Sequence, residues 1–520
     1  MEEFLNIEIE IVEVLLIVTL VAMVARRIRL PYTVALVLAG LLIALQNELR
    51  IELTPELVLA LFLPPLVFEA AFHLRLGQLR ANLTPILTLA IPGVLLSTAL
   101  VGILLSLFGI LPLPAALLFG ALIAATDPVA VIAVFRAVGA PKQLTVLVEG
   151  ESLFNDGTAI VVFHIMLAYV LEGTLSPLEG VVDFFIVSLG GVAIGLILGY
   201  GTAELIARID DYLIEITLTT VAAYGSYLIA ESFHMSGVLA VVMAGLVIGN
   251  VGPRGMSPTT RIVLINFWEY LAFLANSFVF ILIGMNVEYD ELLQFAGSAL
   301  VAVVVVLMVR AVTVYGLGSI LQGVRRGVDR AHLHVMIWGG LRGAVSLALV
   351  LSIPLQVVER RQLLAMSFGV VLFTLLAQAT TIPMVLARLG LTSKKATPLE
   401  YERIQGQLLA TRSAGRHIDH LYQEGALLPV AWETVKEEVD QRQEELSDRL
   451  RELLGEHPGL RDQVISLARI EVLRAQRAAL DELARAGLLS DEALSELEAE
   501  IDAKLEAPHD DEVADIEIPA

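Results

Sequence analysis

Residues 149–163 read EGESLFNDGTAIVVF, and they place three carboxylates, a serine and an asparagine at the head of a longer apolar segment. On a helix, Ser152 and Asp156 share a face, and so do Glu151 and Asn155, because the members of each pair are four residues apart. The apolar continuation puts Asn155 and Asp156 at least about two turns from the far end of such a helix. A surface helix carries these charges freely, whereas a membrane helix needs a partner or a water-filled cavity for each of them.

The composition of the whole chain favours the membrane. Of its 520 residues, 57% are hydrophobic and 17% are charged, and the mean hydropathy is +0.77. Soluble domains are about 45–50% apolar and about 25% charged. The excess comes as long apolar runs such as 95–108 and 301–309, and a membrane-spanning helix needs about 20 mostly apolar residues. Residues 1–390 therefore predict an all-α polytopic membrane protein.

The apolar runs divide into thirteen expected membrane helices. They are 7–25, 31–46, 55–73, 84–107, 115–138, 149–171, 178–202, 212–232, 236–250, 264–287, 297–322, 331–354 and 363–388. We expect the first to be retained rather than cleaved as a signal peptide. The segment before it, MEEFLNIEIE, is acidic, and no small-residue cleavage pattern follows.

The loops between these helices alternate in charge. One set of alternate loops carries Arg26, Arg27, Arg29, Arg75, Arg80, Arg136, Lys142, Arg208, Arg254, Arg261, Arg325, Arg326 and Arg330. The other set carries only Arg50, Arg360 and Arg361. Positive charge marks cytoplasmic loops. We therefore expect the amino terminus outside the cell and the tail from about residue 390 in the cytoplasm.

Two of the expected helices contain residues that interrupt a helix. In the fifth, AATDPVAV (124–131), a proline follows Thr126 and Asp127, and proline removes a backbone donor and clashes with the preceding turn. In the twelfth, WGGLRGAVSLAL (338–349), three glycines surround Arg342. With breaks seven helices apart, helices 1–6 and 8–13 form two halves, and matching breaks indicate a transporter's binding site. The alternative is one ordinary proline kink and one glycine-rich packing helix.

Further polar residues lie at membrane depth. Asp127 lies at the break of the fifth helix, where the freed carbonyl of Thr126 can help to coordinate a cation. Glu69 lies late in the third helix. Arg310 is flanked by apolar residues on both sides, so it needs a buried anionic partner, for which Glu151 is the candidate.

Together these groups are hard oxygen donors, which suit small hard cations rather than soft metals. Low-dielectric surroundings favour the protonated form of a carboxylate. Asp156 could therefore exchange a proton for a cation, which is the minimal chemistry of antiport. Glu149 is either a vestibule charge or a solvated helix cap, and His164 is either a packing residue or a weak proton-path residue.

The composition also excludes several classes of function. The chain has no cysteine, which excludes disulfides, thiolate metal sites and cysteine catalysis. Its net charge is −22, and an acidic chain with an acidic tail does not suggest nucleic acid as a partner. An intramembrane aspartyl protease would need Tyr-Asp and Gly-x-Gly-Asp motifs at Asp127 and Asp156, which are missing. A channel would line its pore with repeated rings of donors. We expect a transporter, not an enzyme, with no cofactor beyond the transported ions.

Four motifs, in this order and spacing, resemble those of the sodium/proton exchangers of the electroneutral branch of the cation:proton antiporters, which includes the NhaP-type antiporters and the animal exchangers. The motifs are FLPPLVFEAAF, ATDPVAV, EGESLFNDGTAIVVF and WGGLRGAVSLAL. The resemblance covers about residues 1–390. It implies a thirteen-helix fold with two inverted six-helix repeats, broken crossing helices 5 and 12, and an elevator-like moving core. It also implies a homodimer in the lipid of the cell membrane, with a role in sodium transport and pH homeostasis.

The resemblance assigns roles to residues of this chain. It implies a Na+ and proton-exchange site at Asp156, Asp127, Ser152, Thr126 and Glu69, with structural support from Asn155, Glu151, Arg310 and Arg342. An Asn-Asp pair, in place of Asp-Asp, implies one-for-one exchange of Na+ or Li+ for H+, which moves no net charge. K+ remains open as the alternative substrate, because the donors are the same and selectivity depends on cavity size.

The tail lies outside the resemblance. Residues 391–505 are rich in Leu, Glu, Arg and Ala and predict amphipathic cytoplasmic helices, with breaks at Pro429, Pro458 and Gly487. Residues 506–520 are acidic and are predicted to be disordered. The tail either binds an unknown regulator, helps the protein to dimerise, or is a passive appendage.

Overall fold

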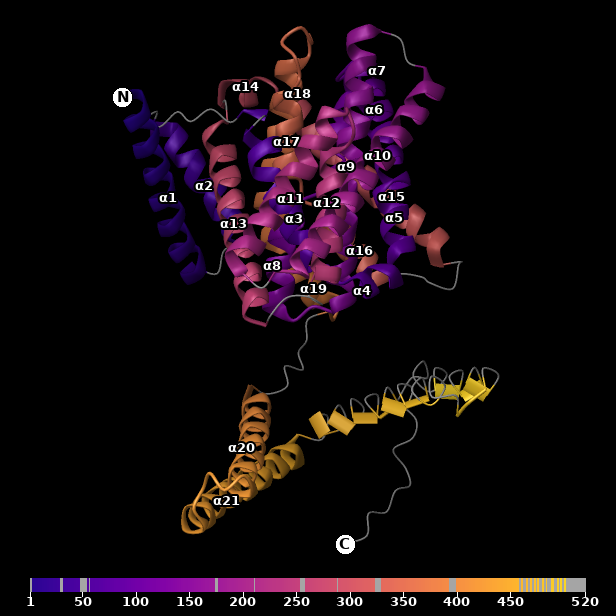
Figure 1. Cartoon of the computed structure of the whole chain (residues 1–520). Helices are drawn as coiled ribbons and strands as arrows, with labels where there is room; N and C mark the ends of the chain where they lie inside the picture. Colours follow the sequence, from indigo (N-terminus) through magenta and orange to yellow (C-terminus); the bar gives the residue numbers. More distant parts are fainter. Residues whose placement is uncertain are drawn as a thin grey trace. The chain divides into compact units, whose positions relative to one another are not determined.

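The chain folds into two compact units, residues 1–393 and residues 394–520 (Figure 1). The computed structural model describes residues 2–28, 31–46, 54–55, 57–173, 176–209, 211–252, 258–287, 289–322, 329–391 and 399–457, and parts of 460–501. The elements that it describes in both units are helical.

The helices of the first unit follow one another with short connections. They are α1 (Glu2–Ile28), α2 (Tyr32–Gln46), the π-helix η1 (Leu57–Phe62), α3 (Leu63–His73), α4 (Leu76–Ala81), α5 (Leu83–Ala90), α6 (Pro92–Leu107), α7 (Leu113–Leu122), α8 (Val129–Val138), α9 (Lys142–Glu172), α10 (Pro177–Ile206), α11 (Tyr212–Ser232), α12 (Gly237–Val251), α13 (Pro258–Met285), α14 (Tyr289–Gln294), α15 (Ala296–Gln322), α16 (Arg330–Trp338), α17 (Ala344–Leu351), α18 (Arg360–Phe373), the π-helix η3 (Thr374–Gln378) and α19 (Ala379–Arg388).

The first unit presents apolar surface of the kind that lipid covers. Seven helices among the described residues are long and apolar enough to cross a membrane, and shorter apolar helices accompany them. On α10, for example, Leu189 and Ile197 are 61% and 71% exposed. Apolar surface on this scale suits lipid rather than water. The prediction of an all-helical polytopic membrane protein is therefore confirmed.

Glycines allow the backbones of α10 and α12 to approach closely. The four-residue spacing of Gly191, Gly195 and Gly199 predicts such packing without naming the partner helix. In the structure, a Cβ on Gly195 would lie 2.2 Å from the carbonyl oxygen of Ala240, and Gly191 and Gly199 also abut α12. On another face of α12, Gly249 lies against the Phe72 backbone of α3. The helix α12 is thus held between α10 and α3.

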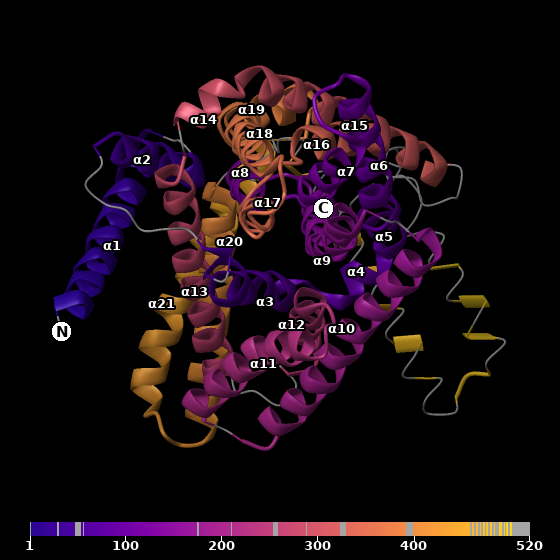
Figure 2. The same ribbon diagram turned by 90° about the horizontal axis from the view of Figure 1, so that it is seen from above.

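Two interruptions of helical structure meet in the middle of the unit. Residues 123–128 separate α7 from α8, and residues 339–343 separate α16 from α17. The N–H of Asp127 donates to the carbonyl oxygen of Leu341 at 2.8 Å, so the two segments are bonded to each other. Both α8 and α17 contact α9, near the centre of the view in Figure 2. The expected interruptions are therefore present in both places.

The helix that carries the opening motif is longer than expected. α9 begins at Lys142, directly after Pro141, rather than at residue 149. The prediction was wrong because the first turn contains Lys142 and Gln143, which a search for apolar runs assigns to a loop. Glu149 consequently lies well inside the helix, so it is not a solvated cap.

Prolines divide two further helices that the sequence predicts as continuous. The expected helix at 55–73 consists of η1 followed by α3, and Pro64 and Pro65 lie in the first turn of α3. Proline fits there because first-turn N–H groups have no helical acceptor. The expected helix at 84–107 is divided into α5 and α6 just before Pro92.

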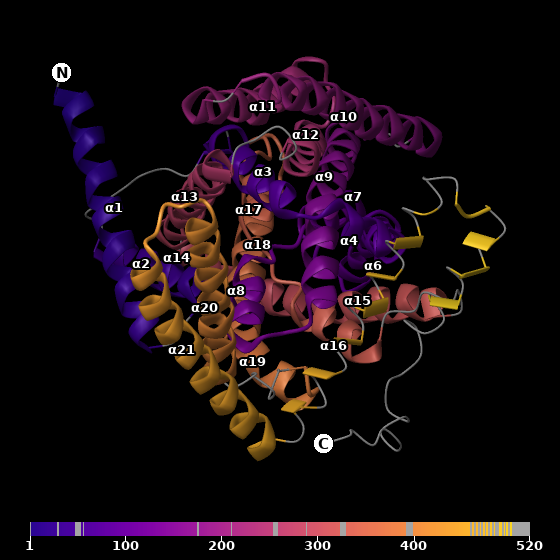
Figure 3. The same cartoon turned by 60° about the horizontal axis from the view of Figure 1, so that its bottom comes forward.

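The second unit contains a hairpin of two long helices, α20 (Leu399–Gln423) and α21 (Pro429–Glu456), which lie side by side in Figure 3. Tyr401, Ile404 and Leu408 of α20 pack with Leu446 and Leu453 of α21 in a small apolar core. Their spacing, three and four residues on α20 and seven on α21, is the amphipathic pattern that the sequence predicts.

One of the helix breaks expected in the tail, at Pro429, lies among the described residues. Pro429 occupies the first turn of α21, a position that proline favours, so a helix boundary lies where it was expected. Other predicted features lie outside the described residues: Pro458, Gly487, residues 506–520 and the loop residues Arg29, Arg50, Arg254, Arg325 and Arg326.

Acidification is expected to weaken the hairpin at Asp419. Its carboxylate accepts hydrogen bonds from Trp432 Nε1 at 3.1 Å and from Lys436 Nζ at 2.9 Å, and the bond from Lys436 holds the pKa of Asp419 below its ordinary value. The stability that a depressed pKa provides is present above the unfolded-state pKa of about 3.9 and is lost as the pH falls through the folded-state value. The effect is small because surface ion pairs contribute little.

Fluorescence can follow this change, because Trp432 is the single tryptophan of residues 394–520. We expect the emission of Trp432, taken as the difference between the native chain and Trp432→Phe, to change below about pH 4. In Asp419→Asn the altered emission should already be present at neutral pH. An emission that stays constant through this range would contradict the assignment.

Candidate functional site

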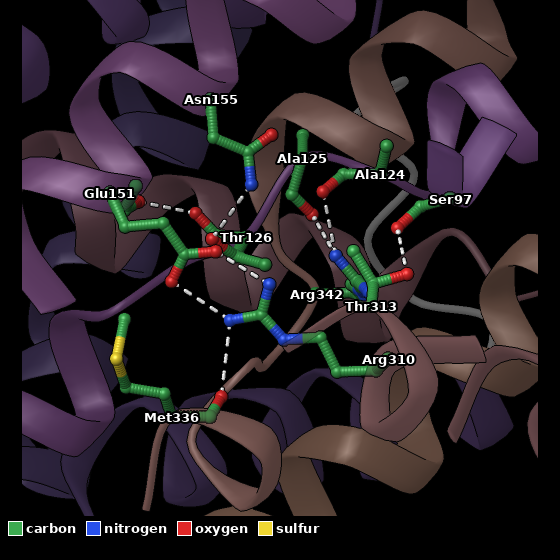
Figure 4. A network of polar contacts seen from close by, with 11 residues as sticks. Ser97, Ala124, Ala125, Thr126, Glu151, Asn155, Arg310, Thr313, Met336 and Arg342 are labelled. Carbon is green, nitrogen blue, oxygen red and sulfur yellow. Dashed lines mark hydrogen bonds and ion pairs between the residues drawn. The ribbon is translucent and has the colours of Figure 1, made fainter. Parts of the chain in front are cut away.

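Two side chains of α9 bind the segment between α7 and α8. Ser152 Oγ donates a hydrogen bond to the carbonyl oxygen of Thr126. Asn155 Nδ2 donates to Thr126 Oγ1 at 3.2 Å (Figure 4). All three residues are at most 5% exposed. Because a chain break leaves backbone groups without helical partners, these bonds fix the break and bring Ser152, Asn155 and Thr126 together.

Arg342 neutralises the broken end of α7. Its Nη1 donates to the carbonyl oxygens of Ala124 and Ala125 at 2.8 and 3.0 Å (Figure 4). Its backbone N–H donates to Thr374 Oγ1 at 3.1 Å. A cation at the carboxyl end of a helix compensates the negative end of the helix dipole. The contacts are those expected of a residue with a structural function.

The carboxylate of Asp127 lies where two helices begin. Its Oδ1 accepts the N–H of Val129, in the first turn of α8, at 3.0 Å. The N–H of Ala344, in the first turn of α17, also bonds to this carboxylate. Gly343 lies directly against it, since a Cβ there would be 2.1 Å from Asp127 Oδ2. An anion between two helix amino termini compensates their positive dipole ends, as Arg342 compensates the opposite end of α7.

Asp156 has an oxygen atom for which the described residues supply no hydrogen-bond donor. Its Oδ1 is shielded from solvent and has no hydrogen-bond partner among the described residues, although the side chain as a whole is partly exposed. Its charged neighbours are Asp127, Glu151 and Arg342. A shielded carboxylate oxygen without a donor is costly. A proton or a bound cation would remove that cost, so the arrangement suits both.

The pair that the sequence predicts between Glu151 and Arg310 is present. Arg310 Nη1 donates to Glu151 Oε1 at 2.5 Å and Nη2 donates to Oε2 at 2.8 Å (Figure 4). A third bond joins Nη2 to the carbonyl oxygen of Met336 at 3.1 Å. The side chains are 9% and 3% exposed for Arg310 and Glu151. This bidentate geometry satisfies both buried charges, so Glu151 is occupied within the protein.

Two predicted candidates have their described contacts with residues outside this group. Glu69 pairs with His73 at 3.2 Å between Oε1 and Nδ1. Among the described residues it forms no hydrogen bond or ion pair with Asp156, Asp127, Ser152 or Thr126. His164 is exposed, and its ring meets Phe163 edge-on.

Sequence reasoning located the glycines of the second break but not what they contact. Gly340 and Gly343 lie against Arg310 and Asp127, and a Cβ on Gly340 would be 2.8 Å from Arg310 Nε. Glycines clustered around a buried arginine signal such close backbone approach. Thr374 carries no comparable signal, because it lies on another helix, far along the sequence.

The chain is similar to known proteins over most of its length. Residues 14–388 match the family model described as sodium/hydrogen exchanger, transmembrane. The chain is 39% identical over 486 residues to the Na+/H+ antiporter ApNhaP of Aphanothece halophytica, covering 92% of each protein. It is 38% identical over 441 residues to the low-affinity Na+/H+ antiporter NhaS1 of Synechocystis sp., covering 84% of each.

The fold is also that of a solved structure. The sodium proton antiporter MjNhaP1 of Methanocaldococcus jannaschii superimposes with a TM-score of 0.63 at 22% identity, covering 75% of this chain and 99% of that one. At this identity the similarity concerns the fold. Together with the family match across nearly the whole first unit, it leads to one conclusion: the chain belongs to the transmembrane sodium/hydrogen exchanger family, whose members are transporters and not enzymes.

Proposed function

We propose that the protein is a secondary antiporter that exchanges Na+ for H+ across the cell membrane, with Asp156 carrying each ion in turn. The observation that carries this proposal is Asp156 Oδ1, which has no donor among the described residues. The carbonyl of Thr126 and the hydroxyl of Ser152, which are hydrogen-bonded to each other, would supply two further oxygen ligands. Oxygen donors of this kind bind small hard cations. The relatives ApNhaP and NhaS1 are both named Na+/H+ antiporters.

The proposed Na+ ligands are Asp156, Asp127, Ser152 and Thr126, with Asn155 orienting Thr126. One-for-one exchange is supported because the neighbouring charged side chains already have partners within the protein. Glu151 is paired with Arg310, and Arg342 is bound to carbonyl oxygens. Asp156 is then the one group of this set that alternates, and it has the same net charge with a proton as with Na+. A cycle that carries one ion each way moves no net charge.

The finer architecture is part of the same proposal. We infer thirteen membrane crossings in two inverted six-helix repeats, with an elevator-like movement of the part that holds α9. The amino terminus would lie outside, residues 391–505 would form the cytoplasmic tail, and the protein would be a homodimer in the lipid. Tags at each terminus, probed in intact cells, test the orientation. Cross-linking in membranes tests the dimer, and a monomer alone would overturn that part.

Purified protein in proteoliposomes is expected to release or take up protons when Na+ is added, and an imposed membrane voltage is expected to leave the rate unchanged. The reason is the unchanged net charge of Asp156 in its two loaded states. Proton flux measured with Na+, Li+ and K+ over a pH series identifies the substrate. We expect Na+ and Li+ to drive flux.

Protein-free liposomes are the control for leak. K+-loaded vesicles with valinomycin set the membrane voltage. Flux driven by K+ and not by Na+ would show that K+, and not Na+, is the transported ion. A rate that follows the imposed voltage would contradict one-for-one exchange, since an electrogenic cycle must respond to it.

A further inference from the structure

One face of α9 is partly exposed at two charged positions. Along residues 146–157, burial is broken only at Glu149, Phe154 and Asp156. Glu149 and Asp156 are seven residues apart, which places them on the same face about two turns, or roughly 10 Å, from each other. Charged side chains in a membrane protein face cavities and not lipid. The partly exposed face of α9 therefore borders water.

The neighbouring helix α3 is open in the same way. Its buried residues are interrupted at Leu66, Glu69, Ala70 and His73, a spacing of three and four residues that defines one helix face. The helices α3 and α9 contact each other, and the charges of Glu69 and His73 lie within electrostatic range of Glu149. We call these partly exposed residues of α3, together with Glu149 and Asp156 of α9, the approach lane.

Glu149 differs from Glu69 in having no partner among the described residues. It forms no hydrogen bond or ion pair among the described residues, whereas Glu69 is bound to His73, and His73 Nε2 lies 3.9 Å from Glu269. Arg136 of α8 is exposed and acts on Glu149 electrostatically through space. A glutamate with a purely structural function would be paired as Glu151 is.

We propose that Glu149 is an approach carboxylate for the transported cation, which attracts Na+ into the lane two helical turns before Asp156. It raises the local cation concentration and is not itself the exchanging group. This inference rests on the proposed antiport, because it assigns a positioning residue to that reaction. The affinity for Na+ at the end of the lane should therefore depend on the charge at position 149, while the maximal rate should not.

The test uses everted membrane vesicles holding the full chain, in which the cytoplasmic face meets the assay medium. For Glu149→Gln we expect the apparent KM for Na+ to rise about threefold to tenfold, from the loss of one charge roughly 10 Å away in a partly polar medium. The maximal rate should stay within about twofold. Glu149→Asp should restore the native KM, and Arg136→Gln should lower it, because an opposing cation is removed.

Changing the ionic strength distinguishes electrostatic attraction of Na+ by Glu149 from a structural effect of the substitution. Raising choline chloride from about 10 mM to about 150 mM shortens the Debye length from about 30 Å to about 8 Å. The KM difference between the native protein and Glu149→Gln should then shrink. The matched control is Glu172→Gln, which removes the same charge from an exposed position at the other end of α9 and should leave the KM unchanged.

The outcomes distinguish this inference from the antiport itself. If the native protein shows no Na+-dependent flux, the proposed function fails. If the native protein transports but Glu149→Gln keeps the native KM, the inference alone fails. It also fails if the KM rises and neither Glu149→Asp nor salt reverses the effect, because that pattern marks a structural function.

Discussion

Replacing Asp156 by asparagine is expected to reduce Na+-driven proton flux to the level of protein-free vesicles, while the protein stays folded. Asparagine has nearly the same shape but neither binds a proton near neutral pH nor carries a negative charge for Na+. In the native protein no described residue donates to Oδ1 of this carboxylate, so neutralising it removes a desolvation cost. We therefore expect the melting temperature in detergent to be unchanged or higher.

The matched control is Asp183→Asn, the same substitution at an exposed position on α10, which should preserve both flux and stability. Substantial Na+-driven flux in Asp156→Asn would refute the assignment of Asp156 as the exchanging group. Loss of flux together with a large loss of stability would show instead that Asp156 holds the fold together.

Part of the site follows from the sequence because charge at membrane depth is so costly. Arg310 lies in a long apolar helix, so it requires a buried anion, and the four-residue spacing of α9 offers Glu151 while leaving Asp156 on a different face. The pair and its geometry agree with that argument. The break at Thr126 and Asp127 follows equally from proline chemistry.

The rest depends on which helix faces which, and one sequence does not contain that information. Glu69 was expected in the ion site on the strength of the resemblance alone, and its ion pair with His73 of the same helix has no signal in the sequence argument. Thr374 bonds to the backbone of Arg342 although it is far away along the chain. The start of α9 was also missed, because a polar first turn looks like a loop.

The surroundings of the Asp127 carboxylate also could not be predicted from the sequence. Its sequence neighbours indicate an exposed break, but only the three-dimensional arrangement places Gly343 against it and the first turns of α8 and α17 around it. Gly343, between α16 and α17, thus serves a contact with the segment between α7 and α8, which its own local sequence cannot specify.

Arg310→Ala is expected to lower the free energy of unfolding by about 3–5 kcal/mol, far more than it changes the preference between Na+ and Li+. The variant leaves Glu151 buried without its two charge-assisted bonds, and the Met336 carbonyl loses a donor. It also opens a cavity beside Gly340, where the guanidinium packs. Thermal melting of the purified dimer or monomer in detergent measures the loss, and proteoliposome flux measures ion preference.

Two further variants make this prediction specific to a buried pair. Arg208→Ala removes one partner of an exposed pair, in which Arg208 and Glu204 lie 2.6 Å apart and are 71% and 66% exposed, so it should cost less than about 1 kcal/mol. Combining Arg310→Met with Glu151→Leu removes both buried charges and should recover much of the stability, since the penalty arises from the unpaired carboxylate. Native-like melting of Arg310→Ala would mean that the pair does not stabilise the fold. A changed ion preference at full stability would instead show that Arg310 helps to select the ion. A charge that only stabilises the fold cannot alter selectivity without first lowering stability.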